Sequence, residues 1–220
     1  MTDTVLTYLD SYCERAGNAA LLAEPLNAVT NLFFILAAVL VARAIIRDGR
    51  PAKQIVDLWL LAASLFCIGI GSGAWHLAPS GTTVLMDVIP ITIFINVYII
   101  ASLRRLFGLS WRKVFGWWAI YQTAGVAAQI YLPADLLNGT IMYIPTYATL
   151  VVMTFALTRR DRDAGRVFAI MTTLWSISLI FRTIDHGICP QFAFGTHFLW
   201  HTLNALVLWR LALVVIRKTT

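Results

Sequence analysis

Residues 84–105 read VLMDVIPITIFINVYIIASLRR, an apolar run with one aspartate near its start and two arginines at its end. A run of about 20 apolar residues is long enough to cross the hydrocarbon core of a membrane as a helix. The strands of a membrane barrel alternate apolar and polar residues over about ten positions, and this run does not alternate. The stretch therefore predicts a transmembrane α-helix.

Similar runs follow one another along the 220 residues, which are 59% hydrophobic and 13% charged. Soluble domains carry about twice that charged fraction. We expect an all-α integral membrane protein with a single domain over 1–220, in which an extracytoplasmic N-terminal segment at 1–19 precedes a seven-transmembrane helix bundle. The predicted spans are 20–46, 57–77, 84–105, 114–132, 139–158, 166–184 and 195–216.

Basic residues mark one side of the predicted bundle. They follow the first, third, fifth and seventh spans, whereas the stretches after the second, fourth and sixth spans contain no lysine or arginine. Basic loops stay in the cytoplasm, so we expect a cytoplasmic C-terminus and an N-terminus outside. Short basic clusters between apolar runs also argue against nucleic acid as a partner. The marker residues are Arg47, Arg50, Lys53, Arg104, Arg105, Arg112, Lys113, Arg159, Arg160, Arg162, Arg166, Arg217 and Lys218, while Arg15 and Arg182 lie toward the other side.

Polar and ionisable residues gather near the predicted outer ends of the helices: Ser72, His76, Asp87, Asp185, His197 and His201. Such groups are costly inside a membrane span and usually mark function. His197 and His201 are four residues apart, which places both on one helix face. Three neutral imidazoles with a fourth position for water are typical of a catalytic zinc site. The alternative is a set of hydrogen bonds between helices, and His186 is expected to be solvated in a loop.

Two further residues fit hydrolytic chemistry at such a site. Asp87 could orient or deprotonate the attacking water. Ser72, one turn before His76, could donate a hydrogen bond to the oxyanion that forms when hydroxide attacks an acyl carbon. The alternative for Ser72 is a helix hydroxyl bonded to the carbonyl of residue 68.

The combination of SxxxH at 72–76, an aspartate at 87 and HxxxH at 197–201 resembles the alkaline ceramidases, as do YCE at 12–14, EPLNAVTNLFF at 24–34 and FRTIDHGIC at 181–189. Their superfamily also includes the adiponectin and progestin receptors and the GPI-remodelling lipid hydrolases. The resemblance implies zinc bound by His76, His197 and His201, with Asp87 as base and Ser72 at the oxyanion. The implied reaction cleaves ceramide, or a related N-acyl lipid, to a sphingoid base and a fatty acid.

The family's calcium site, built around the segment before the first span, matches this chain less closely. Glu14 and Glu24 match, but the family's leading aspartate and tryptophan correspond to Ser11 and Tyr12, and the spacing from Glu14 to Glu24 is one residue short. Calcium takes six to eight oxygen ligands. The candidate ligands are Asp10, Ser11, Glu14, Asn18 and Glu24. Without calcium, Glu24 is expected to be a polar partner of the neighbouring helices.

Two of the three cysteines, Cys13 and Cys189, are predicted to lie outside, where an oxidising compartment permits a disulfide. The ceramidase resemblance implies that they pair, which would tie the N-terminal segment over the metal site. Cys67 lies within the second span and is expected to behave as a small apolar residue.

Several function classes compete on this sequence. A lipid-sensing receptor of the same superfamily is the main alternative to an enzyme, and the short tails favour the enzyme. A retinal protein needs a lysine within a span, but Lys53, Lys113 and Lys218 lie in predicted cytoplasmic segments. A transporter needs ionisable groups across the membrane, whereas these cluster on one side. We therefore expect a zinc-dependent lipid amide hydrolase of a bacterial inner membrane, active on its outer side and with no obligate protein partner, although another acyl lipid stays possible as substrate.

Overall fold

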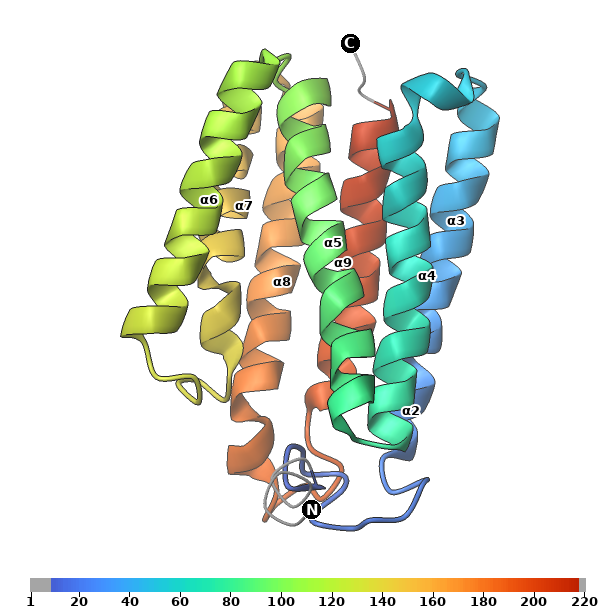
Figure 1. Cartoon of the computed structure of the whole chain (residues 1–220), viewed down its shortest axis with the longest axis vertical. Coiled ribbons are helices and arrows are strands. Elements are labelled where there is room, and N and C mark those ends of the chain that lie inside the picture. Colours follow the sequence, from blue (N-terminus) through green and yellow to red (C-terminus); the bar gives the residue numbers. More distant parts are fainter. Residues whose placement is uncertain (1–8, 218–220) are drawn as a thin grey trace.

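Long helices make up the computed structural model, which describes residues 9–217 (Figure 1). No strand is present in that range, so the all-α prediction is confirmed. The first eight residues of the predicted N-terminal segment, and Lys218, lie outside the described residues. The α-helices are α2 Pro25–Thr30, α3 Leu32–Asp48, α4 Val56–Leu77, α5 Gly81–Arg105, α6 Trp111–Tyr131, α7 Ile144–Arg160, α8 Arg162–Ile188 and α9 His197–Arg217, and short 3₁₀ turns at Ala52–Gln54 and Thr140–Tyr143 precede α4 and α7.

Six helical segments are long and apolar enough to cross a membrane, and they coincide with six of the predicted spans: Pro25–Asp48, Val56–Leu77, Gly81–Arg105, Thr140–Arg160, Arg162–Ile188 and His197–Arg217. The protein is therefore a multi-pass integral membrane protein. Helix α6 coincides with the remaining predicted span but is not among the six. Its mean hydropathy is lowered by Gln122, Gln129 and several tryptophan and tyrosine residues.

The first span begins later than predicted. Residues 20–24 form turns, and α2 begins only at Pro25. Proline is favoured at the first helical position because its missing N–H would have no partner there in any case. The turns before it point the carbonyl groups of Asn18 and Ala20 at the side chain of Arg15. The predicted start at residue 20 is therefore wrong by five residues.

Helix α4 packs against both α3 and α5, while α9 packs against α3 and α8. Two glycines of α4 permit the close approach. A Cβ atom at Gly69 would lie 2.6 Å from the Ile35 side chain, and one at Gly71 would lie 1.8 Å from the Met86 carbonyl oxygen. Small residues let membrane helices come close together. Gly71 thus brings α4 against the turn of α5 that carries Asp87.

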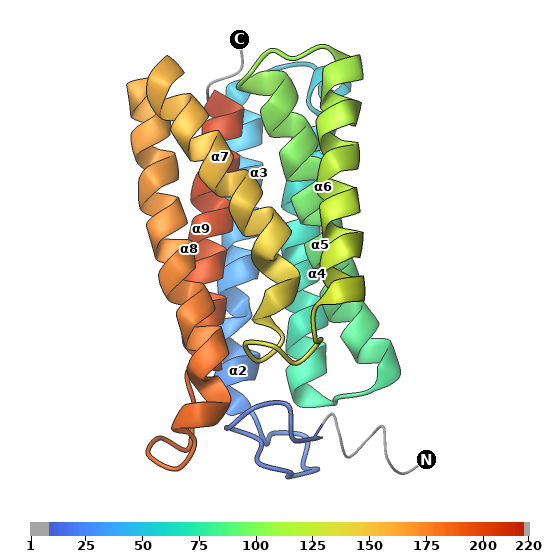
Figure 2. The same ribbon diagram turned by 90° about the vertical axis from the view of Figure 1, so that its left-hand side faces the viewer.

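The two ends of the bundle differ in charge. The connections after α3, α5 and α7 and the end of α9 lie at the top of Figure 1, and we name this the basic end because the marker arginines gather there. Residues 9–24 and the α8–α9 connection lie at the opposite end, which we name the N-terminal end (Figures 1 and 2). There Cys13 and Cys189 form a disulfide with 5.3 Å between their Cα atoms, which is the pairing that the resemblance implies.

Candidate metal centre

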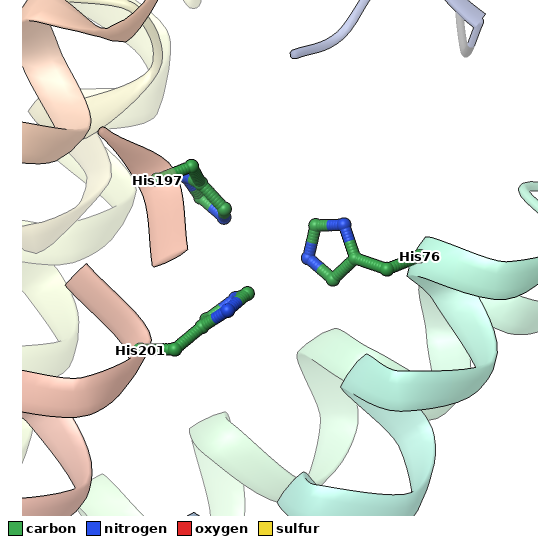
Figure 3. Close-up of side chains that lie close together, drawn as sticks. All are labelled: His76, His197 and His201. Carbon is green, nitrogen blue, oxygen red and sulfur yellow. The ribbon is translucent and has the colours of Figure 1, made fainter. Parts of the chain in front are cut away.

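Three histidines converge at the N-terminal end of the bundle (Figure 3). His76 lies in the last turn of α4, His197 begins α9, and His201 lies one turn further along α9. One ligand atom from each lies within 4.8 Å of the other two, and each residue is at most 1% exposed. This group could hold a metal ion.

Hydrogen bonds on the outer side of two rings determine which nitrogens face the centre. His76 Nδ1 lies 2.5 Å from Glu24 Oε2, so the carboxylate accepts a hydrogen bond from the Nδ1–H group. His201 Nδ1 lies 3.0 Å from Thr30 Oγ1, and because Thr30 donates to the Leu26 carbonyl, its oxygen accepts from the ring. A ring that donates through Nδ1 keeps the Nε2 lone pair for a metal. Both rings are therefore oriented as ligands.

Unpaired nitrogens support a metal at this position. Among the described residues, His201 Nε2 and His197 Nδ1 are buried and have no hydrogen-bond partner. Buried polar atoms are nearly always paired, so an exception calls for an ion or a water. Imidazole nitrogen suits zinc and several other transition metals. The donor set therefore fits the zinc site expected from the sequence.

Asp87 and His197 line one cavity of about 300 Å³ beside the three histidines. Asp87 Oδ1 is buried and has no hydrogen-bond partner among the described residues. Ser72 is 2% exposed and lies on α4, one turn before His76. The tertiary structure thus brings both predicted catalytic residues to the histidines, and the contact across α4 and α5 at Gly71 places them there.

The cavity changes from polar to apolar as it leaves the histidines. Its polar part includes side chains of Asn96, Gln122, Gln129 and Arg182. It continues as a narrow apolar pocket of about 70 Å³ between α5, α7 and α9. The residues that line both parts are Ile91, Ile95, Tyr143, Thr146 and Trp200. A ligand with a polar group at the histidines and a hydrocarbon chain matches this shape.

The alignment of the chain with known families agrees with this geometry. Residues 11–217 match the family model described as Ceramidase. This chain belongs to the ceramidase family. The match implies a hydrolase that acts on an amide and a lipid substrate, as the sequence motifs predicted. No individual curated protein matches the chain.

In this ceramidase-family chain, Asp185 has a role that no spacing indicated. Its carboxylate is fully buried. Oδ1 accepts hydrogen bonds from the backbone N–H groups of Thr196, at 2.6 Å, and His197, at 2.9 Å, and Oδ2 accepts one from Cys13 N at 3.2 Å. A carboxylate is favourable at a helix N-terminus. Asp185 therefore holds both the start of α9, with its metal ligand, and the N-terminal segment.

Gly195 makes this arrangement possible. Its φ of +62° is in the left-handed region, and a Cβ atom there would lie 2.2 Å from Asp185 Oδ1. Both the backbone angle and the space require glycine at this position.

The N-terminal segment covers the centre with an aromatic ring. The Tyr12 ring lies 4.1 Å from the His197 ring and 4.8 Å from the His76 ring, measured between centroids. Its hydroxyl accepts a hydrogen bond from Trp75 Nε1 at 3.3 Å. Burial raises the pKa of Tyr12, so the phenol stays neutral. Tyr12, at the position where the resemblance leads one to expect tryptophan, therefore packs directly on two of the histidine rings.

Most of the residues predicted for calcium already accept hydrogen bonds from the chain. Asp10 is exposed, and the Ser11 carbonyl accepts a hydrogen bond from His186 Nε2 at 2.8 Å. Glu14 accepts from two backbone N–H groups at the start of α2, and burial raises its pKa. Glu24 instead serves His76, and these two residues are 52 positions apart. Only folding brings them together, so no local motif could reveal the pair.

Proposed function

We propose that this protein is a zinc-dependent lipid amide hydrolase that cleaves ceramide to a sphingoid base and a fatty acid. The observation that carries the proposal is the convergence of three buried imidazoles, one of which lines a cavity together with Asp87, next to an apolar pocket. Membership of the ceramidase family supports an amide as the bond that is broken.

His76, His197 and His201 would hold the zinc ion, which supplies a Lewis acid and lowers the pKa of a water to about 7. Asp87 takes a proton from the attacking water and delivers it to the departing amine. A carbon–oxygen bond forms at the acyl carbon as the carbon–nitrogen bond breaks, so water adds hydroxyl to the acid and hydrogen to the amine. The hydroxyl of Ser72, one turn before His76 on α4, is proposed to donate to the oxyanion.

Neighbouring apolar cavities extend from this site and could hold a long hydrocarbon chain. The narrow apolar pocket shares Ile99, Thr149 and Met153 with an apolar groove of about 400 Å³ between α5, α6 and α7. Apolar walls of this kind favour hydrocarbon over water. These cavities support a membrane lipid as the substrate rather than a small soluble amide.

We infer that α6 also crosses the membrane, which makes seven crossings. Its 21 residues extend for about 30 Å at 1.5 Å per residue, and it exposes large apolar side chains such as Phe115, Ile120 and Ile130. Residues 9–24 and the end of α9 lie at opposite ends of the bundle (Figure 1), which an even number of crossings would not give. If the basic end lies in the cytoplasm, the histidine site lies on the outer side of the membrane, which we infer to be the inner membrane of a bacterium.

The test is turnover by the purified full chain. Labelled ceramide, dihydroceramide, an N-acyl amino lipid and a lipid ester are incubated with and without zinc chelation, and the products are identified by mass spectrometry. We expect release of a fatty acid and a long-chain amine that is lost on chelation and restored by zinc. Absence of hydrolysis by zinc-loaded protein on all four lipids would favour the receptor-like alternative.

The Asp87→Asn variant tests the role of the carboxylate. The variant should retain zinc, measured as metal content. Its turnover should fall by at least about 100-fold, because an asparagine side chain cannot take a proton from the attacking water. Ser72→Ala is the companion variant, with an expected loss of about 100-fold if the hydroxyl meets the oxyanion. Full activity of Asp87→Asn would remove Asp87 from the mechanism.

A further inference from the structure

Arg15 is the largest side chain that is fully enclosed at the N-terminal end of the bundle. It is 1% exposed, and so is its partner Glu24. Arginine is almost never fully buried unless it is paired. A buried arginine next to a candidate metal ligand is therefore expected to have a specific structural or functional role.

The guanidinium of Arg15 is surrounded by oxygen atoms from two segments, the stretch 18–24 and the end of α4. Nε donates to Glu24 Oε1 at 2.5 Å. NH1 donates to the carbonyl oxygens of Asn18, at 2.9 Å, and Ala20, at 3.2 Å, and NH2 donates to the carbonyl of His76 at 2.7 Å. One carboxylate and several carbonyls are the ligands that a calcium ion takes. These four contacts therefore form an oxygen cage around a resident positive charge, which we name the Arg15 cage.

The predicted calcium ligands do not fit that ion while Arg15 is in place. Both oxygens of Glu24 are used, one by Arg15 and the other by His76 and Asn27. The side-chain oxygen of Asn18 accepts from Ala20 N at 2.9 Å, and Glu14 is bonded to the start of α2. The oxygens that would approach a divalent ion are therefore already satisfied by donors of the chain itself.

The cage reaches the metal centre through two bonds on one histidine. Arg15 binds the backbone carbonyl of His76, while Glu24, held by Arg15, binds Nδ1 of the same residue. A partner of a metal-bound imidazole fixes its orientation and raises its basicity, and losing that partner costs about 10–100-fold in metal affinity. The cation in the cage thus helps to fix the orientation of the His76 ring toward the metal centre.

We propose that Arg15 is a built-in cation that takes the place of calcium at this second site and makes the histidine centre independent of calcium. A guanidinium stays protonated at any physiological pH, so the cage is permanently filled. Removal of the guanidinium should leave an oxygen site open to a divalent cation. Binding is the readout here, so the proposal stands or fails separately from the proposed hydrolysis.

The experiment compares the full chain with its Arg15→Ala variant in detergent, using calcium chloride or a calcium chelator. For the wild type we expect no heat of calcium binding and no change of thermal midpoint with either addition. Arg15→Ala should lose roughly 5–15 °C of thermal midpoint, because Glu24 is left as an unpaired buried charge. Calcium at millimolar concentration, or methylguanidinium, should restore a large part of that loss and part of the zinc affinity.

Arg105→Ala is the matched control, since Arg105 also binds a carboxylate, Asp57, and a carbonyl, Gln54, but at the basic end. Its thermal midpoint should not respond to calcium. Stoichiometric calcium binding by the wild type would overturn the proposal, and so would a folded Arg15→Ala protein that ignores both calcium and methylguanidinium. If Arg15→Ala does not fold, Arg15→Gln replaces it, and wild-type calorimetry still decides whether calcium binds.

Discussion

Two arginine–carboxylate pairs, one at each end of the bundle, use the same chemistry in opposite surroundings. Arg15 and Glu24 lie 2.5 Å apart and both side chains are 1% exposed. Arg105 and Asp57 lie 2.6 Å apart, with side chains that are 11% and 31% exposed. An exposed pair contributes about 0–1 kcal/mol, whereas removing one partner of a buried pair costs about 3–5 kcal/mol. The pair at the N-terminal end is thus fully enclosed by its partners, whereas the pair at the basic end stays partly exposed.

The largest expected effect comes from breaking the buried pair on its acidic side. Glu24→Ala leaves Arg15 without a counter-charge and His76 without its partner, so we expect a loss of about 3–5 kcal/mol in free energy of unfolding and of about 10–100-fold in zinc affinity. Denaturation in mixed micelles and zinc titration measure the two effects. Asp57→Ala, the control at the basic end, should cost about 1 kcal/mol or less and leave zinc binding unchanged. Equal losses in both variants would erase the contrast between the ends.

Substitution of a glycine with a positive φ at each end of the bundle should give a stability difference of intermediate size. At the N-terminal end, Gly195→Ala combines left-handed strain with a collision against Asp185, so we expect a loss of about 2–4 kcal/mol and weaker zinc binding through His197. At the basic end, Gly49 has a φ of +72° and no atom within 4 Å of an added Cβ, so Gly49→Ala should cost about 1 kcal/mol. Unfolding free energies of the two variants decide; a Gly195→Ala protein as stable as Gly49→Ala would contradict the crowding.

The smallest expected effect concerns two threonine hydroxyls. Thr30→Val removes the acceptor for His201 Nδ1, which should cost about 1 kcal/mol in stability and about tenfold in zinc affinity. Thr158 donates to the Thr154 carbonyl near the basic end and is exposed, so Thr158→Val should change stability by less than about 0.5 kcal/mol. Metal affinity is the discriminating measurement, because only Thr30 touches a histidine. An unchanged affinity in Thr30→Val would show that the ring orientation does not depend on this bond.

Most helices could be predicted from the chain because a membrane helix satisfies its own backbone polar groups and needs only a sufficiently long apolar run. The misplaced start of the first span shows the limit of that rule. Residues 20–24 include an apolar Leu-Leu-Ala, yet they are not helical, and the carbonyls of Asn18 and Ala20 beside them bond to Arg15. An apolar run cannot reveal a backbone that is turned toward a distant charge.

The candidate site divides in the same way. His197 and His201 share a helix face, so their joint role followed from spacing alone, and the polarity of the loops placed them near one face of the membrane. The partners Glu24 for His76 and Asp185 for His197 N lie far away or in another element. Gly71 and Gly195 were not singled out, because a glycine in sequence carries no sign of the atom that a Cβ would meet.

The amino-acid sequence by itself determined the helices, their direction relative to the basic loops, and the residue types able to hold a metal, because these depend on hydropathy, charge and local periodicity. The tertiary structure alone decided which oxygens meet the guanidinium of Arg15, which carboxylate orients His76, and how closely α4 approaches α5. Those outcomes depend on contacts between segments far apart in the chain, where a shift of about 1 Å breaks a hydrogen bond. Packing of His76 and α4 over the ion pair at the N-terminal end encloses it, while its counterpart at the basic end joins two helices and stays partly exposed.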